Sequence, residues 1–132
     1  MKTSIDLASI VYQRVKRSGV LELLGGDVYL GIRPLNSEKN DAVVATLSML
    51  EDTLQRGNVN IRIYAKDIFR GNTHYPNLGL INEAIRLLKP MFKDLYLEKE
   101  KIYIHVESEH YYKVENAQEW VGVIKLITRN TN

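Results

Sequence analysis

Residues 55–67, QRGNVNIRIYAKD, contain the clearest strand pattern in the chain. Four apolar residues alternate there with four polar ones: Val59, Ile61, Ile63 and Ala65 with Asn60, Arg62, Tyr64 and Lys66. Because successive side chains of a strand point to opposite faces, the segment predicts a strand with one buried and one solvated face. The buried face needs a covering layer, so this stretch decides the fold class.

Four further segments predict strands, at residues 28–32, 42–49, 101–106 and 119–129. The segment 42–49 begins β-rich (AVVAT) and ends in a helix-tolerant run (LSML), and we interpret it as a strand. A loop at 51–57 (EDTLQRG) then allows residues 42–49 to pair antiparallel with the 59–66 strand. Residues 110–118 (HYYKVENAQ) read as a continued strand and a turn.

Two segments have helical spacing of their apolar residues. In the first, Ser4 is the expected N-cap and Gly19 the expected stop. The second begins at Leu78, and Pro90 either kinks it or opens a new turn. The polar run 36–41 and residues 68–77 (IFRGNTHYPN) are predicted to be loops.

The predicted order is helix, three strands, helix, two strands. Strands in consecutive hairpins, with helices that can cover one face, favour an α+β fold: a mostly antiparallel sheet of four to five strands with two helices packed on one face. At 132 residues, with no linker or repeat, the chain is expected to form a single domain over residues 1–132.

Composition excludes several classes of protein. There is no cysteine, so no disulfide, zinc-cysteine cluster or thiol nucleophile can form. No apolar run approaches the ~20 residues of a membrane-spanning helix. The net charge of +2 is weak evidence for a polyanionic partner. No phosphate-binding loop or nucleophile motif is present either, so we assign no cofactor, metal or catalytic residue, and we do not expect an enzyme.

One short segment, HVESEH at 105–110, has metal-ligand residue types. On a regular strand His105, Glu107 and Glu109 share a face, and they could hold a divalent metal. The same alternation describes the solvated face of a strand whose Ile102 and Ile104 are buried, and we favour that interpretation.

The aromatic composition is unusual, with eight tyrosines against two phenylalanines and one tryptophan. Tyrosines suit partly exposed sheet faces and subunit interfaces. They also stack on single-stranded bases where basic residues line the same groove. The candidate residues for such a nucleic-acid interface are Arg62, Tyr64, Tyr111, Tyr112 and Lys113. We favour packing or a protein interface, because basic residues are not concentrated around these tyrosines.

The element order, together with GDVYLGIRP (26–34), QRGNVNIRIYAKDI (55–68) and EWVGVIKLITRN (119–130), resembles the small tail-completion and head-tail joining proteins of long-tailed phages and prophages. The resemblance implies an α+β subunit of a ring, often of six copies, at the head-facing end of the tail tube. Such a ring stops tube growth, docks on the connector and leaves a lumen through which DNA passes without sequence-specific binding.

That resemblance implies a homo-oligomer with the tail tube protein and the head-tail connector proteins as partners, located in the virion tail and, during assembly, in the host cytoplasm, with no membrane role. We hypothesise that its interfaces include the polar face of the 59–66 strand and the two predicted loops. The residues are Arg62, Tyr64, Arg70, His74, Tyr75, Asn36, Glu38 and Lys39. The alternatives are a nucleic-acid-binding accessory protein that uses a Tyr/Arg sheet face and a metal-dependent enzyme at residues 105–109.

Overall fold

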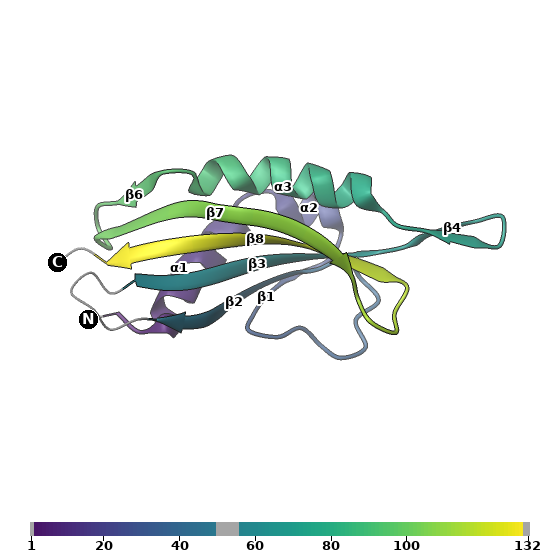
Figure 1. Cartoon of the computed structure of the whole chain (residues 1–132), viewed down its shortest axis with the longest axis horizontal. Coiled ribbons are helices and arrows are strands. Elements are labelled where there is room, and N and C mark those ends of the chain that lie inside the picture. The colour runs from purple at the N-terminus through teal and green to yellow at the C-terminus, as the bar shows by residue number, and fades with distance from the viewer. Residues whose placement is uncertain (1, 50–55, 131–132) are drawn as a thin grey trace.

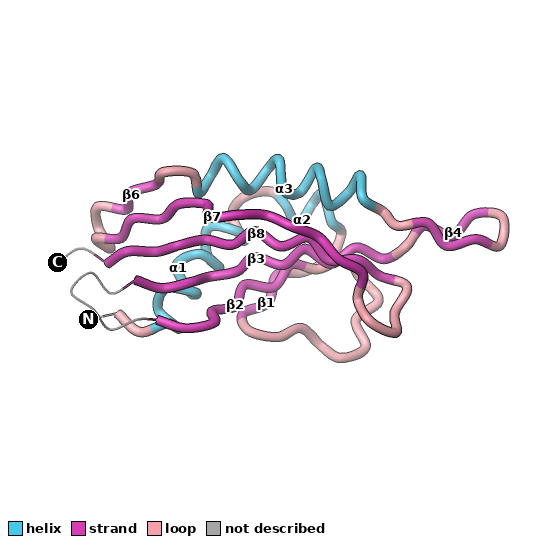
Figure 2. Tube along the Cα trace, viewed as in Figure 1, coloured by secondary structure: helices cyan, strands magenta, loops and turns pink. Residues whose placement is uncertain are grey.

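The computed structural model describes residues 2–49 and 56–130. A curved sheet carries the helices on one face, and a narrow two-stranded arm projects from one end (Figures 1 and 2). The elements are α1 (Ser4–Lys16), α2 (Val20–Leu24), β1 (Val28–Leu30), β2 (Ala42–Met49), β3 (Arg56–Lys66), β4 (Ile68–Arg70), β5 (Thr73–Tyr75), α3 (Leu78–Phe92), β6 (Leu95–Leu97), β7 (Ile102–Lys113) and β8 (Glu119–Asn130). Among these residues, no helix is both long and apolar enough to span a membrane.

The main sheet has six strands in the order β1-β2-β3-β8-β7-β6. β1 and β2 run parallel, and the other neighbours run antiparallel. The predicted pairing of residues 42–49 with the 59–66 strand is confirmed, with Val44 opposite Ile61. Strands β4 and β5 form a second, two-stranded sheet, which we call the arm (residues 68–75).

The predicted fold class is wrong. The sheet is mixed and six-stranded, a second sheet exists, and the described residues contain three helices. The parallel pair arises because residues 31–41, which we call the crossover loop, return the chain to the start of β1 instead of forming a hairpin. Residues 68–77, predicted as a loop, contain the arm. The missed elements are three to five residues long, too short to show a hydrophobic period.

The ends of the two long helices are set by local hydrogen bonds. Thr3, and not the predicted Ser4, caps α1: its hydroxyl accepts from the Asp6 amide at 3.1 Å, and the Asp6 carboxylate accepts from the Thr3 amide at 2.9 Å. The bonds from the Thr3 backbone and hydroxyl hold the pKa of Asp6 below its ordinary value. In α3, the Asn77 side chain accepts from the Leu80 amide, and the helix continues through Pro90 to Phe92.

The core lies between the helices and one face of the sheet. Leu7 and Val11 of α1 and Ile81 and Leu88 of α3 are almost completely buried. They belong to the same cluster as alternate residues of the sheet, which are Ala42, Val44, Val59, Ile61, Ile63, Ala65, Ile102, Ile104, Ile124 and Leu126. The apolar residues of the 59–66 stretch therefore face the helices, as their alternation indicates.

Gly122 sets the distance between α3 and the sheet. A Cβ atom on this residue would lie 2.4 Å from Cγ2 of Ile81 and 3.3 Å from Cδ1 of Ile85. Both neighbours are core side chains, so neither can move away without disturbing the packing. A glycine at this point of β8 lets the helix approach the strand closely.

We predict that Gly122→Ala destabilises the protein by about 1–3 kcal/mol, because the added methyl overpacks the contact with α3. Gly79→Ala is the matched control, since nothing lies within 4 Å of a Cβ at that helical position. The control should leave stability unchanged or raise it by up to about 1 kcal/mol. Urea denaturation measures both, and equal midpoints for Gly122→Ala and the parent chain would contradict the close approach.

Candidate interaction surfaces

The sheet face that points away from the helices is the largest candidate surface, and we call it the open face. Strand register places the polar residues of β3 on it, beside alternate residues of β8 and β7. In register, Arg62 lies beside Val123, and His110 lies on the other side of Val123. Tyr64, Val121 and Tyr112 form the next row. The predicted interface residues Arg62 and Tyr64 are both half-buried on this face.

Three valines of the open face, Val43, Val121 and Val123, are almost completely buried even though they lie outside the core on the helix side. Their cross-strand neighbours are larger, so the aromatic, imidazole and guanidinium side chains of the adjacent strands must close over them. The open face is therefore a packed surface with a polar and aromatic exterior.

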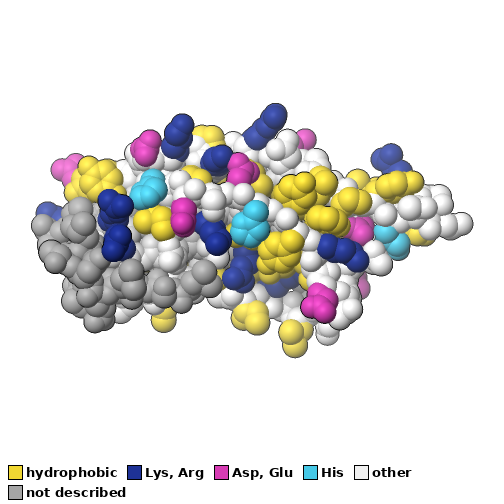
Figure 3. All heavy atoms as spheres, in the orientation of Figure 1, with side chains coloured by type: hydrophobic (Ala, Val, Ile, Leu, Met, Phe, Trp, Pro, Cys, Tyr) yellow, Lys and Arg dark blue, Asp and Glu magenta, His cyan; other side chains and the backbone are white. Residues whose placement is uncertain are grey.

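The open face has an excess of positive charge. Arg62, Lys125 and Arg129 belong to it by register, and within residues 2–49 and 56–130 none of them forms an ion pair. Figure 3 shows Lys and Arg side chains (dark blue) spread across this face, together with His (cyan) and apolar or aromatic groups (yellow). Cations without neutralising partners favour a negatively charged ligand or partner.

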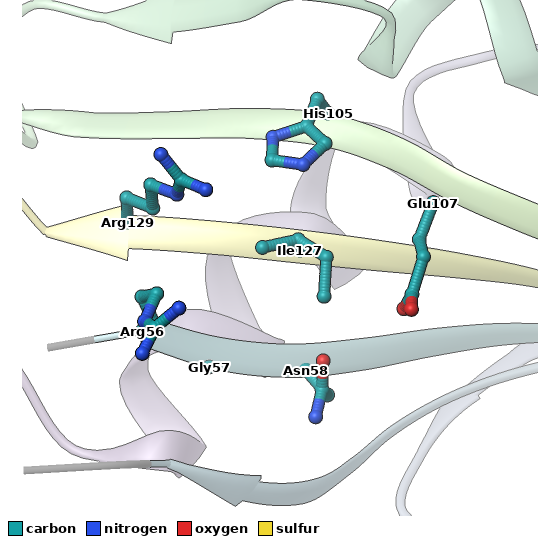
Figure 4. Close-up of a pocket in the computed structure, with 7 residues that line it drawn as sticks. All are labelled: Arg56, Gly57, Asn58, His105, Glu107, Ile127 and Arg129. Atoms are coloured by element: carbon teal, nitrogen blue, oxygen red, sulfur yellow. The ribbon is translucent and has the colours of Figure 1, made fainter.

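A shallow hollow of about 300 Å³ lies at one end of the open face. Its lining residues are Arg56, Gly57, Asn58, His105, Glu107, Ile127 and Arg129 (Figure 4). The two arginines come from adjacent positions of β3 and β8. His105 projects from β7, and Glu107 extends from that strand across β8.

The three metal-ligand candidates do not come together. A bulge between Val106 and Ser108 interrupts the alternation of β7. His105 and Glu107 line the hollow, whereas Glu109 lies on the helix side, where its carboxylate accepts from Lys89 Nζ at 2.6 Å. No group of three His, Asp or Glu side chains suited to a metal ion occurs among the described residues.

The five residues considered for nucleic acid do not all lie on one face, because the neighbours Tyr111 and Tyr112 point to opposite sides of β7 and the bulge turns Tyr112 to the open face. Tyr112 is on the open face with Arg62 and Tyr64, and its ring stacks on His110 at 5.8 Å between centroids. Tyr111 lies on the other face, against Trp120 at 5.9 Å. Lys113 follows Tyr111 in the alternation and shares its side. Only part of the hypothesised set forms one surface.

The crossover loop is fixed to the open face by buried ion pairs. Arg33 forms ion pairs with Glu119 and, at 3.6 Å, with Asp41, and its guanidinium lies 3.9 Å from the centre of the Tyr64 ring. Lys66 Nζ is 3.1 Å from the second oxygen of Glu119. Both carboxylates are essentially buried, so each requires these partners. The Tyr64 ring is thus partly covered by a residue of its own chain.

Hydrogen bonds around Asn40 and Asp41 connect the loop to the residue before β1 and to β3, and they also close the loop on itself. Asp41 accepts from the Asp27 amide at 3.0 Å and from the Ser37 hydroxyl, and its carbonyl accepts from the Tyr64 amide at 2.8 Å. Asn40 accepts from the Lys66 amide at 2.8 Å. Gly26 must be glycine here, because a Cβ would lie 2.1 Å from the Asn40 carbonyl oxygen. The loop is consequently held in one conformation.

This fixed loop presents apolar and polar groups to solvent. Ile32 is 75% exposed and Leu35 is 94% exposed, one residue before and two residues after the half-buried anchor Arg33. The predicted interface residues Asn36, Glu38 and Lys39 line a shallow depression of the loop beside Tyr29. Burial raises the pKa of Tyr29 above its ordinary value, and the charges of Asp41 and Asp27 raise it further.

The arm carries the other predicted interface residues. Arg70 and His74 are exposed, and Tyr75 is 51% exposed. Phe69, 60% exposed, lies across the ribbon from His74 with ring centres 4.8 Å apart. The structure places Arg70, His74 and Tyr75 on a projection well separated from the crossover loop (Figure 1).

Several residues of these surfaces were missed by sequence reasoning. Arg33 and Glu119 are 86 positions apart in the chain, and no local pattern relates them. Asp41 was assigned only to the end of a flexible polar run. Lys125 and Arg129 alternate with the core residues of β8, so the alternation along that strand could have predicted their place on the open face.

Comparisons with known proteins show a shared fold only. No protein-family model matches the chain, and no curated protein sequence matches it significantly. Among solved structures, a chain from the virion of a native gene transfer agent particle superposes with a TM-score of 0.62 at 16% sequence identity. The match covers 93% of this chain and 92% of that chain, so the likeness includes nearly the whole fold.

We predict that Arg33→Ala costs about 3 kcal/mol of stability, because it leaves Asp41 without a cationic partner and Glu119 with Lys66 alone. Faster hydrogen exchange at the Tyr64 and Asp27 amides should accompany the loss, since both donate to Asp41. Lys39→Ala, in the same loop but exposed, is the control and should change stability by less than about 0.5 kcal/mol. Equal losses in both variants would contradict the anchoring role of Arg33.

Proposed function

We propose that this chain is a structural subunit of a phage-like particle that completes the tail and joins it to the head connector as part of a ring. The observation that carries this proposal is the fold shared, over nearly the full length of both chains, with a component of a gene transfer agent virion. The sequence resemblance to tail-completion proteins supports the same class of function independently of the superposition.

Two surfaces of the structure support an assembly role. The crossover loop exposes Ile32 and Leu35 on a rigid support, and the arm exposes Phe69 and Tyr75 away from the body of the fold. Apolar and aromatic groups displayed in this way are the side chains that most often carry the energy of a protein interface. In the proposed ring these two surfaces meet neighbouring subunits, the tail tube and the connector, and DNA passes through the lumen.

A closed ring requires that each subunit use two different patches, one for each neighbour. The loop, the arm and the open face occupy different parts of this molecule, which fits that requirement. The proposed location is accordingly the virion tail and, during assembly, the host cytoplasm.

We predict that light scattering over a wide concentration series at physiological salt gives a discrete multimer with about six times the mass of one chain, as a closed head-to-tail ring requires. The mass should reach a plateau, because a closed ring cannot grow. A monomer at every concentration contradicts spontaneous ring formation. A mass that rises without limit contradicts closure of the ring.

One observation favours a second function, binding of single-stranded nucleic acid. Arg62, Lys125 and Arg129 have no ion pair within the described part of the chain, and Tyr112 and His110 stack on the same face. Backbone phosphates bind such cations, and bases stack on aromatic rings. The surface differs from the one expected from sequence, because Tyr111 and Lys113 lie on its far side.

For this second function we predict that a fluorescent oligothymidine binds the chain with an affinity that falls steeply as salt increases, because phosphate contacts release counterions. Lys125→Ala should weaken binding and reduce the slope of log affinity against log salt by about 1. Lys16→Ala, on α1 and away from the open face, is the control. Binding that is absent, or equally affected by both substitutions, would exclude the open face as the nucleic-acid site.

A further inference from the structure

Strand β7 has a long open edge. β6 pairs only with Ile102–Ile104, so within the described residues no strand pairs with the β6 side of β7 beyond that point. All seven residues from Glu107 to Lys113 are exposed. An uncovered strand edge presents unpaired backbone donors and acceptors, and it is a template for a strand from another chain.

One hydrogen bond fixes which backbone groups of β7 point outward. The Val114 amide donates to the Glu119 carbonyl of β8 at 2.9 Å. Because amide direction alternates along an antiparallel strand, Tyr112 and His110 also bond to β8. The N–H and C=O groups of Glu109, Tyr111 and Lys113 therefore point to the open edge.

The arm is a two-stranded ribbon with no third strand among the described residues. One side carries Ile68, Arg70 and Tyr75, which line a groove of about 330 Å³. The other side carries Phe69 and His74. Such a ribbon has edges available for pairing and is too small to be stable without further contacts.

We propose that the arm of one copy adds to the open edge of β7 in a second copy of this chain. The inference rests on the proposed ring function and names the contact between neighbouring subunits. The arm and the edge are different patches, so the contact is head-to-tail, as ring closure requires.

The side chains of the two partners are complementary on both faces of the extended sheet. On the helix side, the edge offers Glu109 and Tyr111, which suit Arg70 and Tyr75 of the arm. On the open face, it offers the stacked pair His110 and Tyr112, which suits the Phe69 and His74 rings. Opposite charges and aromatic pairs on neighbouring strands stabilise a sheet.

A second copy is the partner that the topology favours. The arm directly follows β3, and in the sheet β8 separates β3 from β7. The arm of the same chain pairs with itself and points away from the body (Figure 2). Pairing with β7 thus requires the arm of a neighbour.

Cross-linking in this cysteine-free chain tests the contact directly. Thr73→Cys places a thiol on the arm, Ser108→Cys places one on β7, and Gln13→Cys on exposed α1 is the control. Two single-cysteine proteins, one enlarged by a tag, are mixed at high concentration with a bismaleimide long enough to reach around the sheet edge. This length is needed because Thr73 shares the side of Arg70 and Ser108 lies on the open face. We expect a strong mixed dimer for Thr73→Cys with Ser108→Cys, and background yield for Thr73→Cys with Gln13→Cys.

A second pair of variants separates the contribution of the β7 backbone from that of its side chains. Tyr111→Pro removes an outward N–H without breaking a bond to β8, whereas Tyr111→Ala removes the same side chain and keeps the donor. Placed in the Ser108→Cys background and checked for folding by circular dichroism, the proline variant should lose the mixed dimer. The alanine variant should retain it, with a yield clearly above the control.

The proposal is overturned if Ser108→Cys gives no more mixed dimer than Gln13→Cys, or if the folded proline variant cross-links as well as the alanine variant. If the mass reaches a plateau at six copies but no arm-to-edge cross-links form, the ring proposal stands and the proposed contact is wrong. Specific cross-links in a chain that never reaches a plateau mass support the contact and contradict the ring.

Discussion

Two buried carboxylates hold the open side of this molecule together. Asp41 and Glu119 are almost inaccessible to solvent, and they meet Arg33, Lys66 and the Asp27 amide. A buried charge is costly unless it is paired, so any conformation that moves Arg33 away is strongly disfavoured. The loop that makes β1 parallel to β2 is thereby fixed, and with it the position of every exposed group on the loop.

Different interactions dominate the helix side and the open side of the sheet. On the helix side, aliphatic burial is continuous, and Gly122 allows α3 to approach the sheet closely. On the open side, Arg62 and Tyr112 lie beside buried valines in register, and Lys125 and Arg129 form no ion pair within the described residues. The first side supplies stability through apolar burial, and the second supplies a surface that a charged or aromatic partner can recognise.

The bulge in β7 connects the fold to its candidate surfaces. By breaking the alternation after Val106, it turns Glu109 and Tyr111 to the helix side and turns His110 and Tyr112 to the open face. Sequence reasoning assumed a regular strand when it placed His105, Glu107 and Glu109 on one face. Its nucleic-acid set named both Tyr111 and Tyr112, which as neighbours on a strand point to opposite faces. No feature of the HVESEH segment predicts the extra residue of the bulge, because a bulge depends on the pairing with the partner strand.

The sequence by itself determined the long elements: β3, the β2–β3 hairpin, β8 and the two long helices follow from hydrophobic periods that extend over several turns or pairs. The polar side of β3, with Arg62 and Tyr64, followed from the same period. Only the tertiary structure decided the parallel β1–β2 pair, the arm, the buried partners of Arg33 and the open edge of β7. Each of these depends on contacts between residues far apart in the chain, and a local pattern carries no information about such contacts.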